Sequence, residues 1–217
     1  MLKILTVMKS GGIYNFDHVS KIKEQCERHI TIPYKFYCLS DKFDEQFNII
    51  SLTDNWPSWF SKLELFKIMG PCFYLDLDTI ITNNIDTILE KYLKSSTDLI
   101  TLRDKLSNKI GSGLMFWNND LEDIYKTAIN SRNMFEAKYG TRKNYARASV
   151  PFGDQEILNQ IVSQANLTTS FFDDQNGKDI VSFKFDLQNG KLFNQDIHKI
   201  VFFHGNPRPW NQNIIIY

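Results

Sequence analysis

Asp76 and Asp78, in the run Asp76-Leu77-Asp78, are the residues of this sequence best suited to chemistry. They follow the apolar run 72–75, which is typical of a buried strand. Two carboxylates spaced i, i+2 at the end of a strand can converge on one cation, and their oxygens suit Mg²⁺ or Mn²⁺. An ordinary acidic turn would look similar, but carboxylates within apolar sequence are costly to bury without a partner. The pattern therefore predicts a divalent metal at this pair.

A second polar motif, His204-Gly205-Asn206-Pro207-Arg208-Pro209-Trp210, follows the apolar run 200–203. A neutral His204 imidazole could complete the ligands of the metal, and Gly205 would let a phosphate approach the backbone. Arg208 could bind that phosphate through two parallel hydrogen bonds. The alternative interpretation is a turn near the C-terminal end, stiffened by its prolines.

Two more charged residues lie beside apolar helical patterns. Lys62 is in a predicted helix, 60–69, that leads into the strand before Asp76; such a lysine is usually solvated, but its ammonium could reach a bound phosphate. Asp154, followed by Gln155, opens the predicted helix 154–162. It could be the N-cap of that helix or an acceptor for a sugar hydroxyl.

The elements that must position these residues alternate between strand and helix. Period-2 and apolar runs predict strands at 2–7, 34–39, 47–52, 72–75, 99–102, 113–117, 171–172, 181–183 and 200–203. Apolar residues at helical spacing predict helices at 16–29, 60–69, 86–93, 121–137 and 154–162; the apolar face of the second comprises Phe60, Leu63, Phe66 and Met69. Such alternation favours an α/β domain with an open, largely parallel sheet, which binds ligands outside the carboxyl ends of its strands.

Composition excludes several classes of partner. The 217 residues include 25 basic and 25 acidic side chains, so the formal net charge is zero and argues against nonspecific binding to nucleic acid or acidic membrane. A hydrophobic share of 42% is enough for a sizeable core. We expect one domain over 1–217, because no linker-like stretch divides it, and we expect no transmembrane segment. Three cysteines without a CxxC motif favour reduced thiols and a cytoplasmic location.

Taken together, these motifs resemble the GT-A fold glycosyltransferases. More narrowly, the chain is similar to a bacterial and phage-type group near the glycogenin and galactosyltransferase-like (family 8-like) enzymes. The resemblance covers most of the chain in order. Its motifs are Thr6 to Tyr14, Phe36 to Asp41, Trp59 to Phe66, Tyr74 to Thr79, Gly111 to Met115, Gly153 to Gln155 and Phe203 to Trp210.

This resemblance implies a transferase, a single GT-A (Rossmann-like) domain with a mostly parallel mixed sheet flanked by helices. Residues 1–82 would bind the nucleotide, and residues 83–217 the sugar and the acceptor. The substrates would be a nucleotide-sugar, with a UDP-sugar as the expected donor, and a hydroxyl of a saccharide or other acceptor. The cofactor would be manganese (Mn²⁺) or Mg²⁺, bound at the DXD motif.

The resemblance also implies roles for individual residues. The metal ligands would be Asp76, Asp78 and His204. Donor contacts would come from Thr6, Val7, Gly11, Gly12, Tyr14, Lys62, Asp76, Ser112, Gly113, Gly205 and Arg208. Catalytic positions would be Asp154, Gln155 and Lys184, the last of which matches a short lysine-bearing strand.

One motif departs from the family pattern, and two other functions remain open. The family commonly places glycine three and lysine six residues after the histidine, whereas here Gly205 follows His204 at once and Arg208 comes four later. A haloacid-dehalogenase-like phosphatase would use Asp76 and Asp78 as nucleophile and acid/base, with Asp173-Asp174 as a later motif. A non-catalytic module that binds sugar or nucleotide through the same fold is the other alternative.

Overall fold

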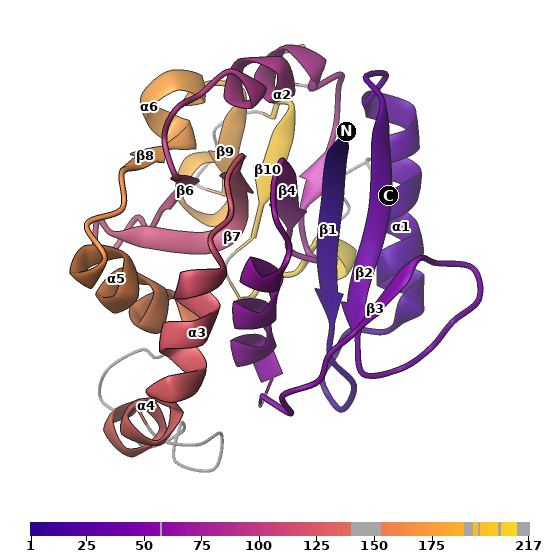
Figure 1. Ribbon diagram of the computed structural model, residues 1–217. Coiled ribbons are helices and arrows are strands. Elements are labelled where there is room, and N and C mark those ends of the chain that lie inside the picture. Colours follow the sequence, from indigo (N-terminus) through magenta and orange to yellow (C-terminus); the bar gives the residue numbers. More distant parts are fainter. Residues whose placement is uncertain (57, 140–152, 189–192, 195, 204, 212–217) are drawn as a thin grey trace.

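The computed structural model describes residues 1–56, 58–139, 153–188, 193–194, 196–203 and 205–211. A sheet of seven strands, in the order β3-β2-β1-β4-β7-β6-β8, forms its centre (Figure 1). The strands are β1 (Leu2–Met8), β2 (Tyr34–Ser40), β3 (Ile49–Ser51), β4 (Cys72–Leu75), β6 (Leu99–Arg103), β7 (Ile110–Trp117) and β8 (Thr169–Phe171). Strands β3, β2, β1 and β4 are parallel, β7 runs antiparallel to β4 and β6, and β8 is parallel to β6.

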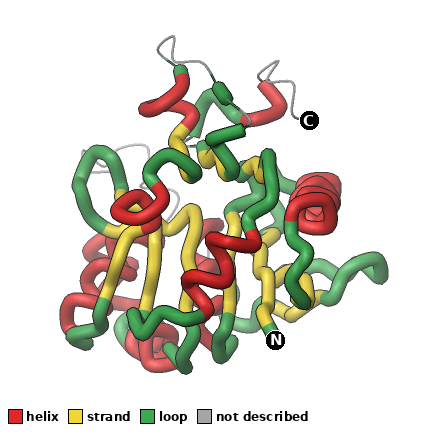
Figure 2. The backbone as a smooth tube through the Cα atoms, turned by 90° about the horizontal axis from the view of Figure 1, so that it is seen from above, coloured by secondary structure: helices red, strands yellow, loops and turns green. Residues whose placement is uncertain are grey.

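Helices cover both faces of this sheet, as the view from above shows (Figure 2). They are α1 (Phe16–His29), α2 (Asp86–Leu93), α3 (Glu122–Asn130), α4 (Arg132–Tyr139), α5 (Asp154–Gln164) and α6 (Phe172–Asn176). A 3₁₀-helix, η1 (Ser58–Lys67), leads into β4, and short helical turns follow at η3 (Phe183–Leu187) and η4 (Pro209–Asn211). The helices α1 and α2 pack on one face, whereas η1, α3 and α5 pack on the other.

The pleat of the strands divides the apolar side chains between two cores. In β4, Phe73 and Leu75 join the core under α1 and α2, whereas Cys72 and Tyr74 join the core under η1, α3 and α5. Successive side chains of a strand point to opposite faces, so strands buried on both sides become continuous apolar runs. This pattern explains why β1, β2, β4 and β7 are recognisable in the sequence.

A second, three-stranded sheet brings the end of the chain to the DXD motif. Its order is β5-β10-β9, formed by β5 (Ile80–Ile81), β10 (Ile200–Phe202) and β9 (Ile180–Ser182). The strand β5 follows Asp78 by one residue and pairs antiparallel with β10. Thr82 N–H donates to the Lys199 carbonyl at 2.8 Å, which extends that pairing. Residues after β10 are thereby placed next to residues 76–78.

The sequence-based prediction of an α/β fold with a mixed, mostly parallel sheet is confirmed. Two helix predictions are wrong in detail. The segment 60–69 is a 3₁₀-helix, and Met69 is 60% exposed beyond its end rather than part of the apolar face. The stretch 121–137 forms two helices, α3 and α4, because the chain breaks helical geometry at Ser131.

Cys26, Cys38 and Cys72 are buried free thiols whose pKa values are raised by burial. No helix among the described residues has the length and hydropathy required to span a bilayer.

Candidate active site

Two cavities adjoin at the edge where β1 and β4 end. The β7 cavity, of about 310 Å³, is lined by Tyr14, Trp59, Lys62, Asp76, Asp78, Leu102, Asp104, Gly111, Ser112, Gly113, Gly153, Asp154, Gln155, Phe202, Phe203, Gly205 and Arg208. The β1 cavity, of about 270 Å³, is lined by Val7, Lys9, Ser10, Gly12, Ile13, Tyr14, Trp59, Ser61, Lys62, Tyr74, Asp76, Leu77 and Arg208. Five residues line both cavities: Tyr14, Trp59, Lys62, Asp76 and Arg208. Two compartments therefore meet at one aspartate, two cations and two aromatic rings.

The two aspartates of the DXD motif lie where β4 meets β7. Asp76 N–H donates to the Gly113 carbonyl at 2.9 Å, which extends the β4–β7 pairing by one residue and fixes the turn that follows. The Tyr74 hydroxyl donates to one Asp76 carboxylate oxygen. Asp78, one turn further, is only 3% exposed. Burial raises the pKa of Asp78 to about 6, and the nearby Asp76 carboxylate adds to the rise.

Lys62 bridges carboxylates from two distant elements. Its Nζ lies 2.8 Å from Asp76 Oδ1 and 3.8 Å from Asp154 Oδ2. Burial disfavours the charged ammonium, but Asp154 and Asp76 outweigh that effect and raise the lysine pKa. The Lys62 side chain is 13% exposed, so it is a part of the site and not a solvated lysine.

Asp154 is buried at the first turn of α5, where Gly153 takes the N-cap position that the sequence left open to Asp154. Gly153 N–H donates to Glu156 Oε2 at 2.7 Å, as in a capping box. The Ser112 hydroxyl bonds the Asp154 carboxylate, and burial raises the pKa of Asp154. Asp154 is therefore not the N-cap of α5, and it lines the β7 cavity.

Arg208 reaches the DXD motif from the end of the chain. Its Nη1 forms an ion pair with Asp78 Oδ2 and donates to the Tyr14 hydroxyl at 2.8 Å. Burial and the Asp78 carboxylate raise the pKa of Tyr14. Gly205 adopts φ +65°, a left-handed conformation that glycine accepts without strain, and lets the chain turn back after β10. The shorter motif therefore still delivers its cation to Asp78.

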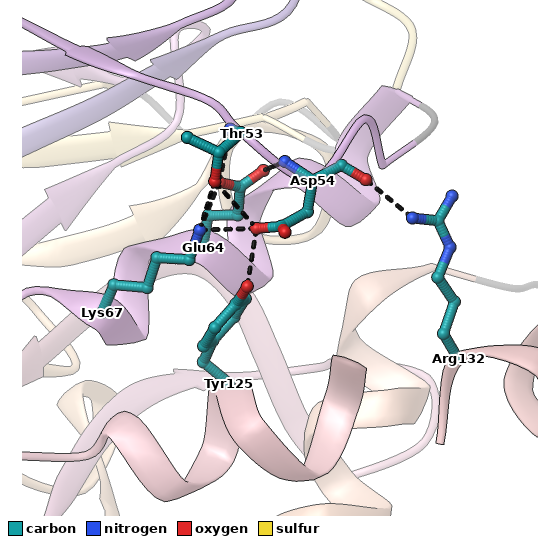
Figure 3. A network of polar contacts seen from close by, with 6 residues as sticks. All are labelled: Thr53, Asp54, Glu64, Lys67, Tyr125 and Arg132. Atoms are coloured by element: carbon teal, nitrogen blue, oxygen red, sulfur yellow. Dashed lines mark hydrogen bonds and ion pairs between the residues drawn. The ribbon is translucent and has the colours of Figure 1, made fainter. Parts of the chain in front are cut away.

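A polar network fixes the helix that carries Lys62 (Figure 3). On η1, the Glu64 carboxylate accepts from Thr53 N–H at 2.9 Å and from Asp54 N–H at 3.2 Å. Lys67 bonds both carboxylates, and the Tyr125 hydroxyl on α3 donates to Asp54 Oδ2 at 2.6 Å. None of these residues lines either cavity, so the network holds η1 without taking part in the cavity walls.

The loop after β1 is tied to the end of β2. Ser10 donates to Asp41 through its backbone N–H at 2.8 Å and its hydroxyl at 2.7 Å, and Lys9 Nζ lies 3.1 Å from the same carboxylate. These hydrogen bonds outweigh the effect of burial and lower the pKa of Asp41 to about 2. The wall of the β1 cavity is therefore held by two neighbouring parallel strands.

Most residues named from the sequence line the two cavities. Those on the β7 cavity are Tyr14, Lys62, Asp76, Asp78, Ser112, Gly113, Asp154, Gln155, Gly205 and Arg208, and those on the β1 cavity include Val7 and Gly12. His204 lies outside the described residues. Asp173 and Asp174 pair with Arg103 and do not line either cavity, so the structure does not join them to the DXD motif.

Three named residues lie elsewhere. Thr6 is fully buried because the pleat of β1 points it to the face opposite to Val7. Gly11 adopts φ +82° in the loop beyond β1 but does not line a cavity. Lys184 is exposed on the helical turn η3 after β9, so the predicted lysine-bearing strand is wrong.

Trp59 and Asp104 are among the cavity residues to which the sequence assigned no role. Trp59, 37% exposed, borders both cavities and packs beside Gly153. Asp104 follows β6 and lines the β7 cavity. A tryptophan three residues before Lys62, and an aspartate at the end of a predicted strand, were the signals that could have identified them.

The described residues of the site are compatible in part with a divalent metal. Asp76 and Asp78 supply hard carboxylate oxygens, which suit Mg²⁺ or Mn²⁺. Within the described ranges, no group of three or more potential metal ligands occurs. A third protein ligand would have to come from a residue such as His204.

Comparison with solved structures identifies the fold. Glycosyltransferase GlyE of Streptococcus pneumoniae TIGR4 matches with a TM-score of 0.67 and 16% identity, over 97% of this chain and 56% of that one; its apo form gives 0.66 and 15%. Galactosyltransferase LgtC, in complex with donor and acceptor sugar analogs, matches with a TM-score of 0.62 and 11% identity over 99% and 91%. No protein-family model and no curated protein matches the sequence. The chain spans little more than half of GlyE, and its fold is the GT-A fold of these glycosyltransferases.

Proposed function

We propose that the chain is a glycosyltransferase that moves a sugar from a nucleotide-sugar, a UDP-sugar, to a hydroxyl of a saccharide or other acceptor. The observation that carries the proposal is the junction of the two cavities, where two cations face the carboxylates of the DXD motif. A nucleotide-sugar has two bulky ends joined by a diphosphate, and two compartments joined by cations match that shape. The GT-A fold of GlyE and LgtC supports the same function.

Each part of the donor has a complementary region. The β1 cavity would hold the nucleoside, because its walls are the loop after β1 and the apolar side chains Val7 and Ile13. The β7 cavity would hold the sugar against Ser112, Asp154 and other polar groups that can bond hydroxyls.

The cationic side chains would stabilise the leaving group. Breaking the bond between the anomeric carbon and the phosphate oxygen leaves an extra negative charge on the nucleoside diphosphate. Lys62 and Arg208 line both cavities and would place an ammonium and a guanidinium beside that charge. Arg208 presents a planar fork that matches phosphate oxygens. A Mn²⁺ or Mg²⁺ ion held by Asp76, Asp78 and His204 would add Lewis-acid stabilisation of the same diphosphate.

The sugar end would be oriented by hydrogen bonds. Asp154 is buried and bonded by Ser112, so its remaining lone pairs can accept from a sugar or acceptor hydroxyl. Gln155 lines the same cavity and offers both a donor and an acceptor. Fixed groups of this kind lower the barrier by positioning the two reactants.

The test is donor hydrolysis and transfer with a panel of UDP-sugars, with and without Mn²⁺. We expect activity with at least one UDP-sugar, and a loss of at least 100-fold in Asp78→Asn. Asp123→Asn is the matched control, because Asp123 is 96% exposed on α3. Activity of Asp78→Asn equal to that of the control would exclude a role for the DXD motif. Phosphate release from a simple phosphomonoester, without need of a nucleotide-sugar, would favour the phosphatase alternative instead.

A further inference from the structure

Building on the proposed function, we propose that Arg208 and a divalent cation compete for the Asp78 carboxylate, and that the nucleoside diphosphate relieves this competition by drawing Arg208 to its phosphates. The metal and the nucleotide would then bind with strong positive coupling. The nucleotide-free protein would bind the metal weakly.

The Asp78 carboxylate is already engaged on the side that faces the cavity. It is nearly fully buried, and its Oδ2 carries the Arg208 guanidinium, while the Tyr14 hydroxyl hydrogen-bonds the same side chain. A carboxylate oxygen coordinates Mg²⁺ at about 2.0–2.1 Å. A metal at that distance and a guanidinium nitrogen in contact with the same oxygen would bring two positive charges together. Asp78 Oδ2 can therefore serve one of the two cations at a time.

Of the two basic residues that line both cavities, Arg208 is the one able to leave. Lys62 contacts both Asp76 and Asp154, and its side chain is 13% exposed. Arg208 is 21% exposed and pairs with Asp78. It also lines both cavities, so a diphosphate between them would be within reach of the guanidinium. Phosphate oxygens would replace the carboxylate as its partner.

The charges of the site favour binding the two ligands together. Within the ion-paired cluster, three carboxylates (Asp76, Asp78 and Asp154) face two cations (Lys62 and Arg208), which gives these five residues a formal charge of −1. A divalent cation alone would reverse that charge and would also break the Arg208 ion pair. A metal with a diphosphate keeps the site negative and gives Arg208 a new partner. Such coupling acts equally on both ligands, and typical values are about 5–150-fold.

Calorimetric titration of Mn²⁺ into the whole chain tests this, in the absence of nucleotide and with saturating UDP, corrected for Mn²⁺ bound by free UDP. For the unmodified protein we expect the Mn²⁺ affinity to be at least tenfold higher with UDP. In Arg208→Gln the Mn²⁺ affinity without UDP should rise about tenfold, because Oδ2 is released, and the coupling should shrink. Arg28→Gln is the matched control, since Arg28 lies on the exposed side of α1, paired with Glu24.

Tyr14→Phe gives a second measurement that keeps the charge of Arg208. It removes the hydroxyl that accepts from Arg208, so Arg208 is held less firmly at Asp78. The Mn²⁺ affinity without UDP should then rise about threefold. Melting curves verify that each variant is folded. If neither variant binds Mn²⁺ more tightly than the unmodified protein, although that protein binds UDP with Mn²⁺, the competition is refuted and the proposed function stands. If the unmodified protein binds UDP neither with nor without Mn²⁺, the proposed function itself fails.

Discussion

Lys62 Nζ lies 2.8 Å from Asp76 Oδ1, and the same ammonium is near Asp154 on a different helix. One cation thus neutralises parts of two carboxylates, of which Asp154 is buried and Asp76 is 27% exposed. Removing one partner of a buried ion pair is more costly than the pair is worth, since the remaining charge has no partner. The stability of the site therefore depends on Lys62.

We expect Lys62→Met to lower the free energy of unfolding by about 3 kcal/mol at neutral pH. The loss should be smaller at pH 5, because burial raises the pKa of Asp154 and this carboxyl, once unpaired, can take up a proton. Urea unfolding at the two pH values measures this. Lys23→Met, which removes an exposed pair with Glu27 on α1, should cost less than about 0.5 kcal/mol. Equal losses in the two variants would contradict a structural role for Lys62.

The network behind η1 predicts an effect of a residue that does not line either cavity. The Tyr125 hydroxyl donates to Asp54, and Lys67 links Asp54 to Glu64 (Figure 3). Tyr125→Phe should destabilise the protein by about 1.5 kcal/mol, the value of a hydrogen bond to a charged group. It should also raise KM for the donor several-fold, because η1 presents Lys62, with little change in kcat. A loss of stability with an unchanged KM would mean that the network only holds the fold.

The same Asp54 gives a pH dependence. Burial opposes its ionisation, but hydrogen bonds from Lys67 and Tyr125 prevail and lower its pKa to about 2, against 3.8 for the ordinary carboxyl. A depressed pKa stabilises the folded state above the unfolded pKa, and this contribution disappears as the pH falls through the folded value. It amounts to about 2 kcal/mol at pH 7, with about half lost at pH 3.

Asp54→Asn removes this titration. We expect the variant to be less stable than the unmodified protein at pH 7, and the difference to narrow between about pH 4 and pH 2. Guanidinium unfolding over pH 7 to 2.5 measures the difference. Asp41, whose pKa is also about 2, is present in both proteins, so its titration cancels in the difference between them. A difference that stays constant over this range would show that Asp54 is not held ionised by its neighbours.

The sequence predicted the strands of the fold better than its helices. Apolar runs such as 72–75 identify strands because both faces of the sheet are covered, so the signal comes from local residues. The segment 60–69 has apolar residues at spacings of three, which fit an α-helix and the observed 3₁₀-helix alike. Only tertiary packing decides between these forms, and it leaves Met69 exposed.

Sequence motifs predicted which residues belong to the site, but not which of these residues form ion pairs with one another. Asp76, Asp78 and Arg208 were found because charged residues follow apolar strands. The ion pairs of Lys62 with Asp154 and of Arg208 with Asp78 depend on strands that pair across long stretches of chain. The prediction for Lys184 failed for a local reason. The strand expected at 181–183 ends at Ser182, and Lys184 lies in the helical turn η3 that follows.

Because the two cavities are distinct, we expect substitutions in one of them to change the binding of the sugar and the binding of the nucleotide to different extents. Gly113 lines the β7 cavity and not the β1 cavity, and a methyl group there would lie 3.5 Å from Asp76 Oδ2 and 3.3 Å from Leu102 Cδ1. Gly113→Ala should therefore weaken binding of a UDP-sugar about tenfold, while binding of UDP changes less than twofold. The melting temperature should change little, because the strand conformation suits alanine. Gly12→Ala, on the β1 cavity, should weaken UDP and UDP-sugar alike. Calorimetry with both ligands compares the variants, and equal weakening of UDP and UDP-sugar by Gly113→Ala would contradict the assignment of the β7 cavity to the sugar.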